Sequence, residues 1–197
     1  GEVVVLPQDG PPQTYLVSSG LGGAQALFPD GTPCVCRFLD WGFWGGRVPY
    51  LDGDGTPQAD NFHAGGYVAG LLPEVGQIPT SGSAVYNGFA YGEAARDVGG
   101  AWARYLATGD LRIDWDFQSR SGGIAITGFD GRDFSGDVFS QNGRELVGTL
   151  SDPLGGVSGA ATASFFQAGA DPVGNVGGSW FVEGDSYLAT GILAGER

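Results

Sequence analysis

The sequence predicts an all-β protein, namely an eight-stranded antiparallel up-and-down β-barrel preceded by a smaller β-rich handle region. Glycine and proline supply 38 and 11 of the 197 residues, which interrupts long helices and favours short strands joined by turns. From about residue 84 onward, short alternating segments recur between glycine or aspartate turns, at the spacing typical of a barrel or sandwich. Hydrophobic residues make up 42% of the chain, enough to form a core.

Eight alternating segments support the barrel, and the second is the clearest. Its apolar and polar residues alternate with the period of a strand that buries one face. The apolar set is Leu111, Ile113, Trp115 and Phe117, and the polar set is Arg112, Asp114, Asp116 and Gln118. The eight segments are SAVYNGFAYGE, TGDLRIDWDFQ, SGGIAITGF, RDFSGDVFS, RELVGTL, GAATASFFQAG, VGGSWFVEG and SYLATGILAG.

The turns between these segments indicate short hairpins. Asp130 with Gly131, and Asn142 with Gly143, are pairs that tight hairpins favour because they tolerate positive φ. Eight sequential strands can close on themselves, which removes exposed sheet edges and leaves an interior that side chains fill. We therefore assign residues 81–197 to the barrel.

Residues 1–80 have a different composition and form the predicted handle region. EVVVL and TYLVSS are two short strands, and they precede the segment CVCRFLDWGFW and the polar stretch LDGDGTPQADN. The segment LLPEVGQIPTSG then links the handle to the barrel. We expect Trp41 and Trp44 to pack the handle on the barrel.

Four stretches resemble the C-terminal β-barrel of transferrin-binding protein B and related bacterial surface lipoproteins. They are WGFWGG, PTSGSAVYNGFAYG, LRIDWDF and GVSGAATASFFQAGADPVGNVGGSWFV. Asn175 and Val176 precede the Gly-Gly pair, where the family has a phenylalanine, a glycine and an acid. The resemblance implies a barrel flanked by a handle, located on the extracellular or outer-membrane surface of a bacterium. It also implies binding of host iron proteins or haem.

Charge and hydropathy exclude several classes of partner. The net charge is −13, so we expect no basic patch that could neutralise the phosphates of a nucleic acid. No apolar run approaches the roughly 20 residues of a membrane helix, and outward charges at Arg112, Asp114 and Asp116 argue against a lipid-facing barrel. The chain begins at Gly1 and contains no methionine, so we expect a monomeric domain of a longer exported protein, binding a protein or small ligand.

Both cysteines lie in CVCRFLDWGFW, at positions 34 and 36. On a strand their Cα atoms would stand near the outer limit for a disulfide, so a bridge would be strained. These two thiols with the single histidine cannot complete the usual four ligands of zinc. We expect Cys34 and Cys36 to be either bridged to each other or buried as free thiols.

His63 is the only histidine and carries the whole case for haem. One imidazole can ligate haem iron, with Tyr67 or Tyr50 assisting beside the tryptophan-rich segment of Trp41 and Trp44. A lone histidine among glycines is more often a hydrogen-bonded structural residue. The predicted binding residues are therefore His63, Trp41, Trp44 and Tyr67.

Asp52, Asp54 and Asp60 form the one candidate metal site, for calcium. The stretch departs from an EF-hand, because Pro57 replaces the glycine and no glutamate closes the loop, so we expect a solvated loop. No nucleophile motif or catalytic acid pair is found, and we predict no enzyme. The function expected is a non-catalytic binding or display module. The alternatives are a haem or small-ligand carrier using His63 and a structural end-domain of a longer surface protein.

Overall fold

The computed structural model describes residues 2–5, 13–19, 38–51 and 53–197. These residues are almost entirely β, and the one helix among them is a 3₁₀ turn, η1 (Val75–Gln77). Within the described ranges, no helix has the length and apolar character needed to cross a membrane.

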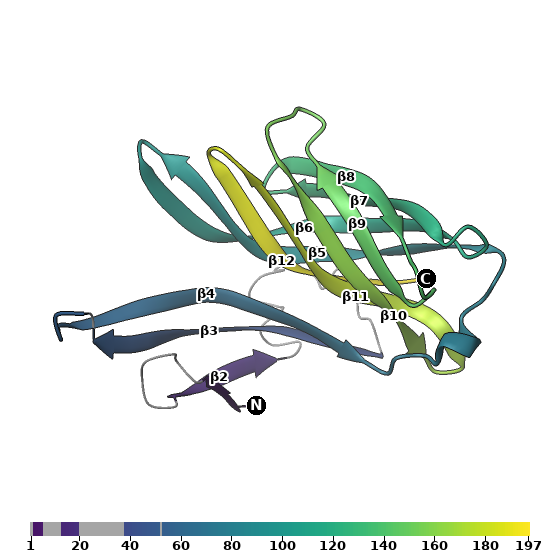
Figure 1. Cartoon of the computed structure of the whole chain (residues 1–197), viewed down its shortest axis with the longest axis horizontal. Coiled ribbons are helices and arrows are strands. Elements are labelled where there is room, and N and C mark those ends of the chain that lie inside the picture. The colour runs from purple at the N-terminus through teal and green to yellow at the C-terminus, as the bar shows by residue number, and fades with distance from the viewer. Residues whose placement is uncertain (1, 6–12, 20–37, 52) are drawn as a thin grey trace.

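The handle is a four-stranded antiparallel sheet with the order β1-β2-β3-β4. Its strands are β1 (Glu2–Val5), β2 (Gln13–Ser19), β3 (Leu39–Leu51) and β4 (Pro57–Gly70). The predicted strands EVVVL and TYLVSS correspond to β1 and β2. The long hairpin of β3 and β4 follows, and it places the tryptophan-rich segment in the sheet (Figure 1).

The barrel contains eight antiparallel strands in sequential order and closes between β12 and β5, as predicted (Figure 1). The link LLPEVGQIPTSG lies between β4 and the first barrel strand and contains η1. The barrel strands are β5 (Ser83–Val98), β6 (Ala101–Asp116), β7 (Ser121–Phe129), β8 (Arg132–Phe139), β9 (Glu145–Ser151), β10 (Ser158–Ala168), β11 (Asp171–Gly184) and β12 (Tyr187–Glu196).

Side chains fill the barrel interior, and aromatic rings dominate it. The Phe165 ring lies 5.6 Å from the rings of Tyr86 and Trp115, and the Trp180 ring lies 4.7 Å from that of Phe129 in an edge-to-face contact. The alternation predicted for β6 is confirmed. Leu111, Ile113, Trp115 and Phe117 are buried, and Arg112, Asp114, Asp116 and Gln118 are exposed.

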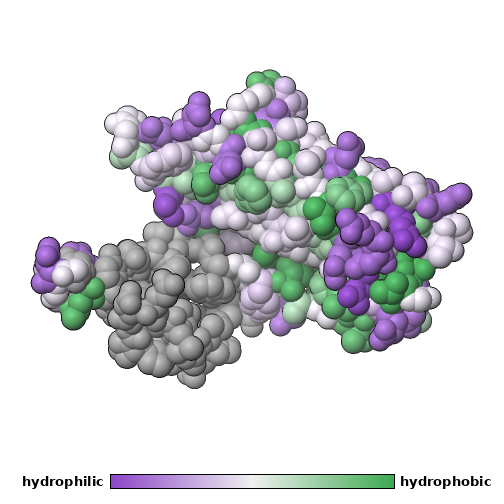
Figure 2. Space-filling view, viewed as in Figure 1, coloured by the Kyte–Doolittle hydropathy of each residue, from purple (hydrophilic) through white to green (hydrophobic). Residues whose placement is uncertain are grey.

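The outward positions of the barrel carry a mixed surface. Figure 2 shows apolar and polar side chains interspersed over the face in view. Arg112 and Asp114, two residues apart on β6, form an exposed ion pair of 2.6 Å. Such a pair contributes little to stability because water screens it.

One predicted turn is confirmed and the other works differently. Asp130 and Gly131 both have positive φ, 53° and 71°, as a tight hairpin requires. At the second turn only Gly143 has positive φ, 82°. Asn142 instead accepts hydrogen bonds from the backbone N–H groups of Arg144 and Glu145, each at 2.9 Å, and so closes the turn with its side chain.

Glycines allow a close approach of β5 and β12. Gly92 and Gly191 face each other across the two strands. A methyl group added to Gly92 would meet the carbonyl oxygen of Thr190, and one added to Gly191 would meet that of Tyr91. Both obstacles are backbone atoms, which cannot move aside without separating the strands.

We therefore expect Gly92→Ala to destabilise the protein by about 1–3 kcal/mol, the usual cost of forcing extra atoms into a packed site. Gly76→Ala is the control, because nothing lies within 4 Å of the added methyl group. Its effect should stay within about 0.5 kcal/mol. Urea unfolding measures both values, and equal midpoints for the two variants would contradict the close approach.

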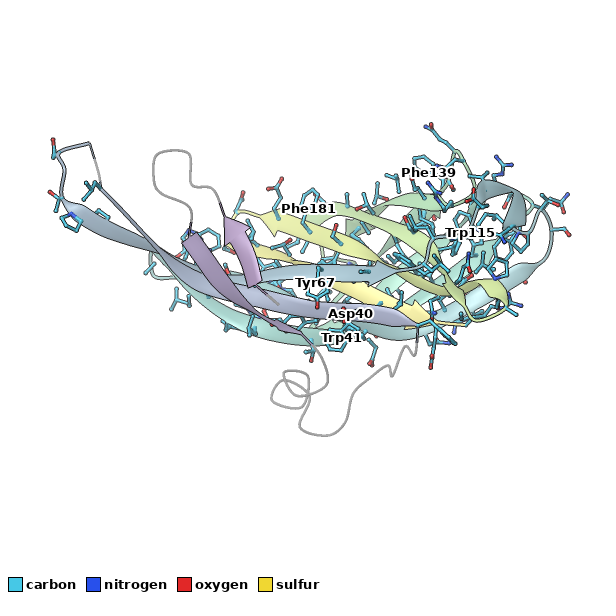
Figure 3. All side chains as sticks on the ribbon, turned by 90° about the horizontal axis from the view of Figure 1, so that it is seen from below. Asp40, Trp41, Tyr67, Trp115, Phe139 and Phe181 are labelled. Carbon is cyan, nitrogen blue, oxygen red and sulfur yellow. The ribbon has the colours of Figure 1, made fainter. Side chains whose placement is uncertain are left out.

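The handle sheet packs on the outside of the barrel. Trp41 of β3 is buried, and its ring centroid lies 4.6 Å from that of Phe89 on β5. Tyr91 of β5, with Ile192 and Ala194 of β12, completes this cluster. The predicted packing role of Trp41 is thus confirmed (Figure 3). The side chain of Trp44 lies outside the described part of the chain.

Strand β4 crosses the barrel with matched large and small residues. Its alternate residues 66, 68 and 70 face the barrel, where a small residue on one partner meets a larger side chain on the other. Gly66 lies against Ile192, Val68 lies against Gly177, and Gly70 lies against Phe166. This complementarity fixes the position of β4, and with it the site described next.

Candidate functional site

A groove of about 460 Å³ lies between β4 and the outer faces of β9, β10 and β11. Strand β4 forms one wall, and residues of the barrel strands form the floor. The lining residues are Gly66, Tyr67 and Val68 of β4, Glu145, Leu146 and Val147 of β9, Thr162, Ala163, Ser164 and Phe166 of β10, Gly177, Gly178 and Ser179 of β11, and Ile192 of β12.

Contacts between β4 and the barrel set one border of the groove. Ile192 and Phe166 contact β4 on either side. Between them Gly177 leaves room for Val68, because a methyl group on Gly177 would meet the Val68 side chain. Gly178 shares the inward direction of Trp180, and a methyl group there would meet the backbone carbonyl of Thr162. Gly177 therefore allows β4 to approach the barrel closely at the border of the groove.

The groove floor is neutral and rich in hydroxyl groups. The side-chain oxygens of Thr162 and Ser179 lie 3.2 Å apart, within hydrogen-bond distance. Among the lining residues Glu145 alone is charged, and Arg144 pairs with it at 3.3 Å. A surface of apolar groups with a few hydroxyl groups suits the side chains of another protein better than a strongly charged ligand.

Tyr67 is the predicted binding residue that lines the groove (Figure 3). It is half-buried and faces Gly42 of β3 across the handle sheet. A methyl group on Gly42 would stand 2.9 Å from the Tyr67 ring, so the ring covers the glycine. This contact holds the ring on the face of the handle sheet opposite to residues 66 and 68, so the ring points away from the barrel.

Of the other predicted binding residues only Trp41 has a described side chain, and the structure does not place it in this groove. Trp41 is buried at the joint between handle and barrel. The backbone of His63 lies in β4, but its side chain, like that of Trp44, falls outside the described part. Haem ligation by His63 thus stays a prediction.

The predicted calcium and disulfide residues also remain untested. Asp54 lies exposed in the turn between β3 and β4, and the backbone of Asp60 pairs with Val48. Asp52, Cys34 and Cys36 lie outside the described residues. Across the ranges that are described, no group of three or more histidine, cysteine or acidic side chains is placed to hold a metal ion.

The buried ionisable groups of the barrel have structural roles. The Tyr86 hydroxyl donates to the carbonyl oxygen of Val173 at 2.7 Å, and burial raises its pKa. Burial, with a smaller contribution from the Glu93 carboxylate, raises the pKa of Tyr91 to about 12. Burial also raises the pKa of Tyr187. Each phenol is held neutral at physiological pH, which does not suit a nucleophile.

These shifts predict alkaline lability. Unfolded tyrosines ionise near pH 10, whereas folded Tyr91 stays neutral until about pH 12. The free energy of unfolding should therefore be intact below pH 10 and fall as pH rises from 10 to 12. Phenolate absorbance should show Tyr86, Tyr91 and Tyr187 ionising only as the protein unfolds. Ionisation of all seven tyrosines near pH 10 in the folded state would contradict the burial.

Sequence reasoning missed the groove floor, although a signal was present. The outward positions of ATASF and GGSWF carry Thr162, Ser164 and Ser179. The outward positions of β6 carry charged residues, as at Arg112 and Asp114. A run of small hydroxyl residues at outward positions therefore indicated a surface of a different kind.

The fold and the groove define a class of protein: a closed eight-stranded barrel with a handle sheet packed on its outer face. No model of a known protein family matches the chain, and no curated protein matches it. Solved structures do share the fold.

The transferrin-binding protein B designated Ap-TbpB, with its N and C lobes, aligns with a TM-score of 0.58 at 12% identity, over 100% of this chain and 37% of that one. A variant of transferrin-binding protein B from Haemophilus parasuis aligns with a TM-score of 0.56 at 14% identity, over 81% of this chain and 32% of that one. A protein described as a surface lipoprotein aligns with a TM-score of 0.52 at 9% identity, over 81% of this chain and 75% of that one. The chain thus spans about a third of the transferrin-binding proteins, and the resemblance seen in the sequence is confirmed for the fold.

Proposed function

We propose that this chain is a non-catalytic module, displayed on the surface of a bacterium, that binds a partner protein through the groove between β4 and the barrel. The observation that carries the proposal is the neutral floor of Thr162, Ser164 and Ser179 on a chain of net charge −13. A surface of this composition loses little solvation energy when another protein covers it.

Apolar side chains next to the groove extend the proposed contact surface. Phe139 on β8 pairs with Val147 on β9, and Val147 pairs with Thr162 of the groove floor. Phe181 follows Ser179 two positions along β11, on the same outer face. Phe139, Val147 and Phe181 are each about half exposed. Figure 3 labels Phe139 and Phe181. Half-exposed aromatic residues around a neutral depression are typical anchors of protein interfaces.

The comparisons support the surface location and the class of partner. The similar structures include proteins named for transferrin binding and a surface lipoprotein. A protein partner is therefore favoured over a small ligand, and binding over catalysis. The competing functions are the haem carrier and the structural end-domain. A haem carrier would bind hemin, and a structural end-domain would capture no partner through the groove.

Thr162→Arg tests the proposal, because it places a long charged side chain on the exposed groove floor without changing the core. The control is Leu154→Arg in the turn between β9 and β10, where the side chain is 94% exposed. The immobilised wild-type chain and the control should capture the same protein from the native medium, and Thr162→Arg should lose it. Equal capture by both variants would overturn the proposal. A Soret shift on adding hemin would favour the haem carrier instead.

A further inference from the structure

Strand β6 extends beyond its neighbour β7 and leaves a sheet edge. It pairs with β5 along its whole length, from Asp116 at one end to Ala101 at the other. Its pairing with β7 begins only at Asp110, opposite Thr127. Among the described strands, none pairs with residues 101–109 on this side. Figure 1 shows the β5–β6 hairpin projecting away from β7 and β8.

The edge of β6 stays unpaired in the described chain because β7 ends beside Gly109 and the chain turns away there. Gly109 lies against Phe129, the last residue of β7, where a methyl group would stand 2.9 Å from the Phe129 side chain. The next residue, Asp130, accepts hydrogen bonds from the Tyr105 hydroxyl at 2.9 Å and from Arg96 Nε at 2.8 Å. The turn after β7 is thus fastened to the hairpin and cannot extend along it.

We propose that residues 101–109 of β6 bind an extended segment of a partner polypeptide, which adds to the sheet as a further strand. Every second residue of an edge strand directs its N–H and C=O groups outward, and another strand supplies groups at the matching spacing. An edge of this length offers roughly 30 Å of main chain. This proposal concerns a different surface from the groove and stands independently of it.

The edge lacks the features that normally prevent strand addition. Proteins protect edges with lysine, proline, bulges or inward charges. The segment AWARYLATG has neither lysine nor proline, and its one charged residue, Arg104, pairs with Glu93 at 3.1 Å. Trp102 is 49% exposed, and Tyr105 and Leu106 are each 37% exposed. Apolar side chains on both faces of the edge can cover those of an added strand.

Charge favours a basic segment of another protein over a second copy of this chain. Asp97 faces Trp102 near one end of the edge, and Asp110 lies exposed at the other end. Carboxylates at both ends attract a strand that has basic residues near its termini. A second copy would bring its own net charge of −13 to the same place.

A synthetic peptide tests this inference directly. The probe alternates valine and threonine over about nine residues, the length of the edge, and has arginine at both ends. Nuclear magnetic resonance of the intact chain should show that the amide protons of residues 101–109 that point outward become protected as the peptide is added. N-methylation of alternate peptide residues should weaken binding at least about tenfold, because it removes main-chain donors without altering the protein. Replacing the terminal arginines with glutamate should weaken it as well.

Three results would overturn the proposal. One is the absence of protection at millimolar peptide, and another is binding that N-methylation leaves unchanged. The third is protection of residues 101–109 without peptide, together with a dimer in solution, which would assign the edge to a second copy. Trp102→Ala should weaken peptide binding. Phe139→Ala should not, because Phe139 lies at the end of β8 and not on the edge of residues 101–109.

Discussion

Replacing Trp180 with alanine should destabilise the barrel by about 3–5 kcal/mol, the range for losing a large buried aromatic side chain. Trp180 is almost fully buried, and its ring meets Phe129 edge-to-face at 4.7 Å. Its Nε1 donates to the carbonyl oxygen of Ile192 at 3.1 Å. Alanine would leave a cavity and also an acceptor without its partner.

The next residue offers a matched control. Phe181 points outward and is 47% exposed, so Phe181→Ala should cost about 1 kcal/mol or less. Urea unfolding of both variants, with unchanged slopes, measures the contrast. If Phe181→Ala were as destabilising as Trp180→Ala, the inward and outward faces of β11 would be assigned wrongly.

Replacing Trp41 with alanine should separate the handle from the barrel. The indole packs on Phe89 and is 9% exposed, so its loss removes the largest side chain of the joint. We expect a cost of about 3–5 kcal/mol to the handle–barrel contact. Because the interior of the barrel does not include Trp41, the barrel should stay folded while the handle detaches.

Limited proteolysis can detect this detachment, since a freed handle exposes the link of residues 71–82 to cleavage. Trp102→Ala is the control, because Trp102 is 49% exposed and lies away from the joint. The link should be cut faster in Trp41→Ala than in Trp102→Ala or wild type. Equal cleavage rates in all three proteins would show that Trp41 does not hold the handle.

The barrel was predictable because one buried face imposes a local pattern on each strand. Strand β6 shows this at Leu111, Ile113 and Trp115, and all eight predicted segments are strands. Part of β5 does not follow the simple alternation, because the handle covers its outer face. Phe89 and Tyr91 point outward there and are buried nonetheless.

The candidate site could not be predicted from local patterns, because it depends on where one sheet crosses the other. Tyr67 was singled out as a binding residue, but the sequence does not indicate that its strand, β4, lies beside β9–β11. Val147, Thr162 and Ser179 lie on three different barrel strands and meet only through the strand register. Likewise, the exposed edge of β6 depends on the point at which β7 ends, which a turn signal near Asp130 locates only approximately.

Site-specific photo-crosslinking tests most directly the claim that the groove is the binding surface. A photoreactive phenylalanine analogue would be placed at position 179 on the groove floor, or at position 154 in the remote turn. If the groove binds the partner, the captured protein should crosslink to the analogue at position 179 and not to the analogue at position 154. A crosslink from position 154 alone would contradict it, because the partner would then contact the barrel turns and leave the groove open.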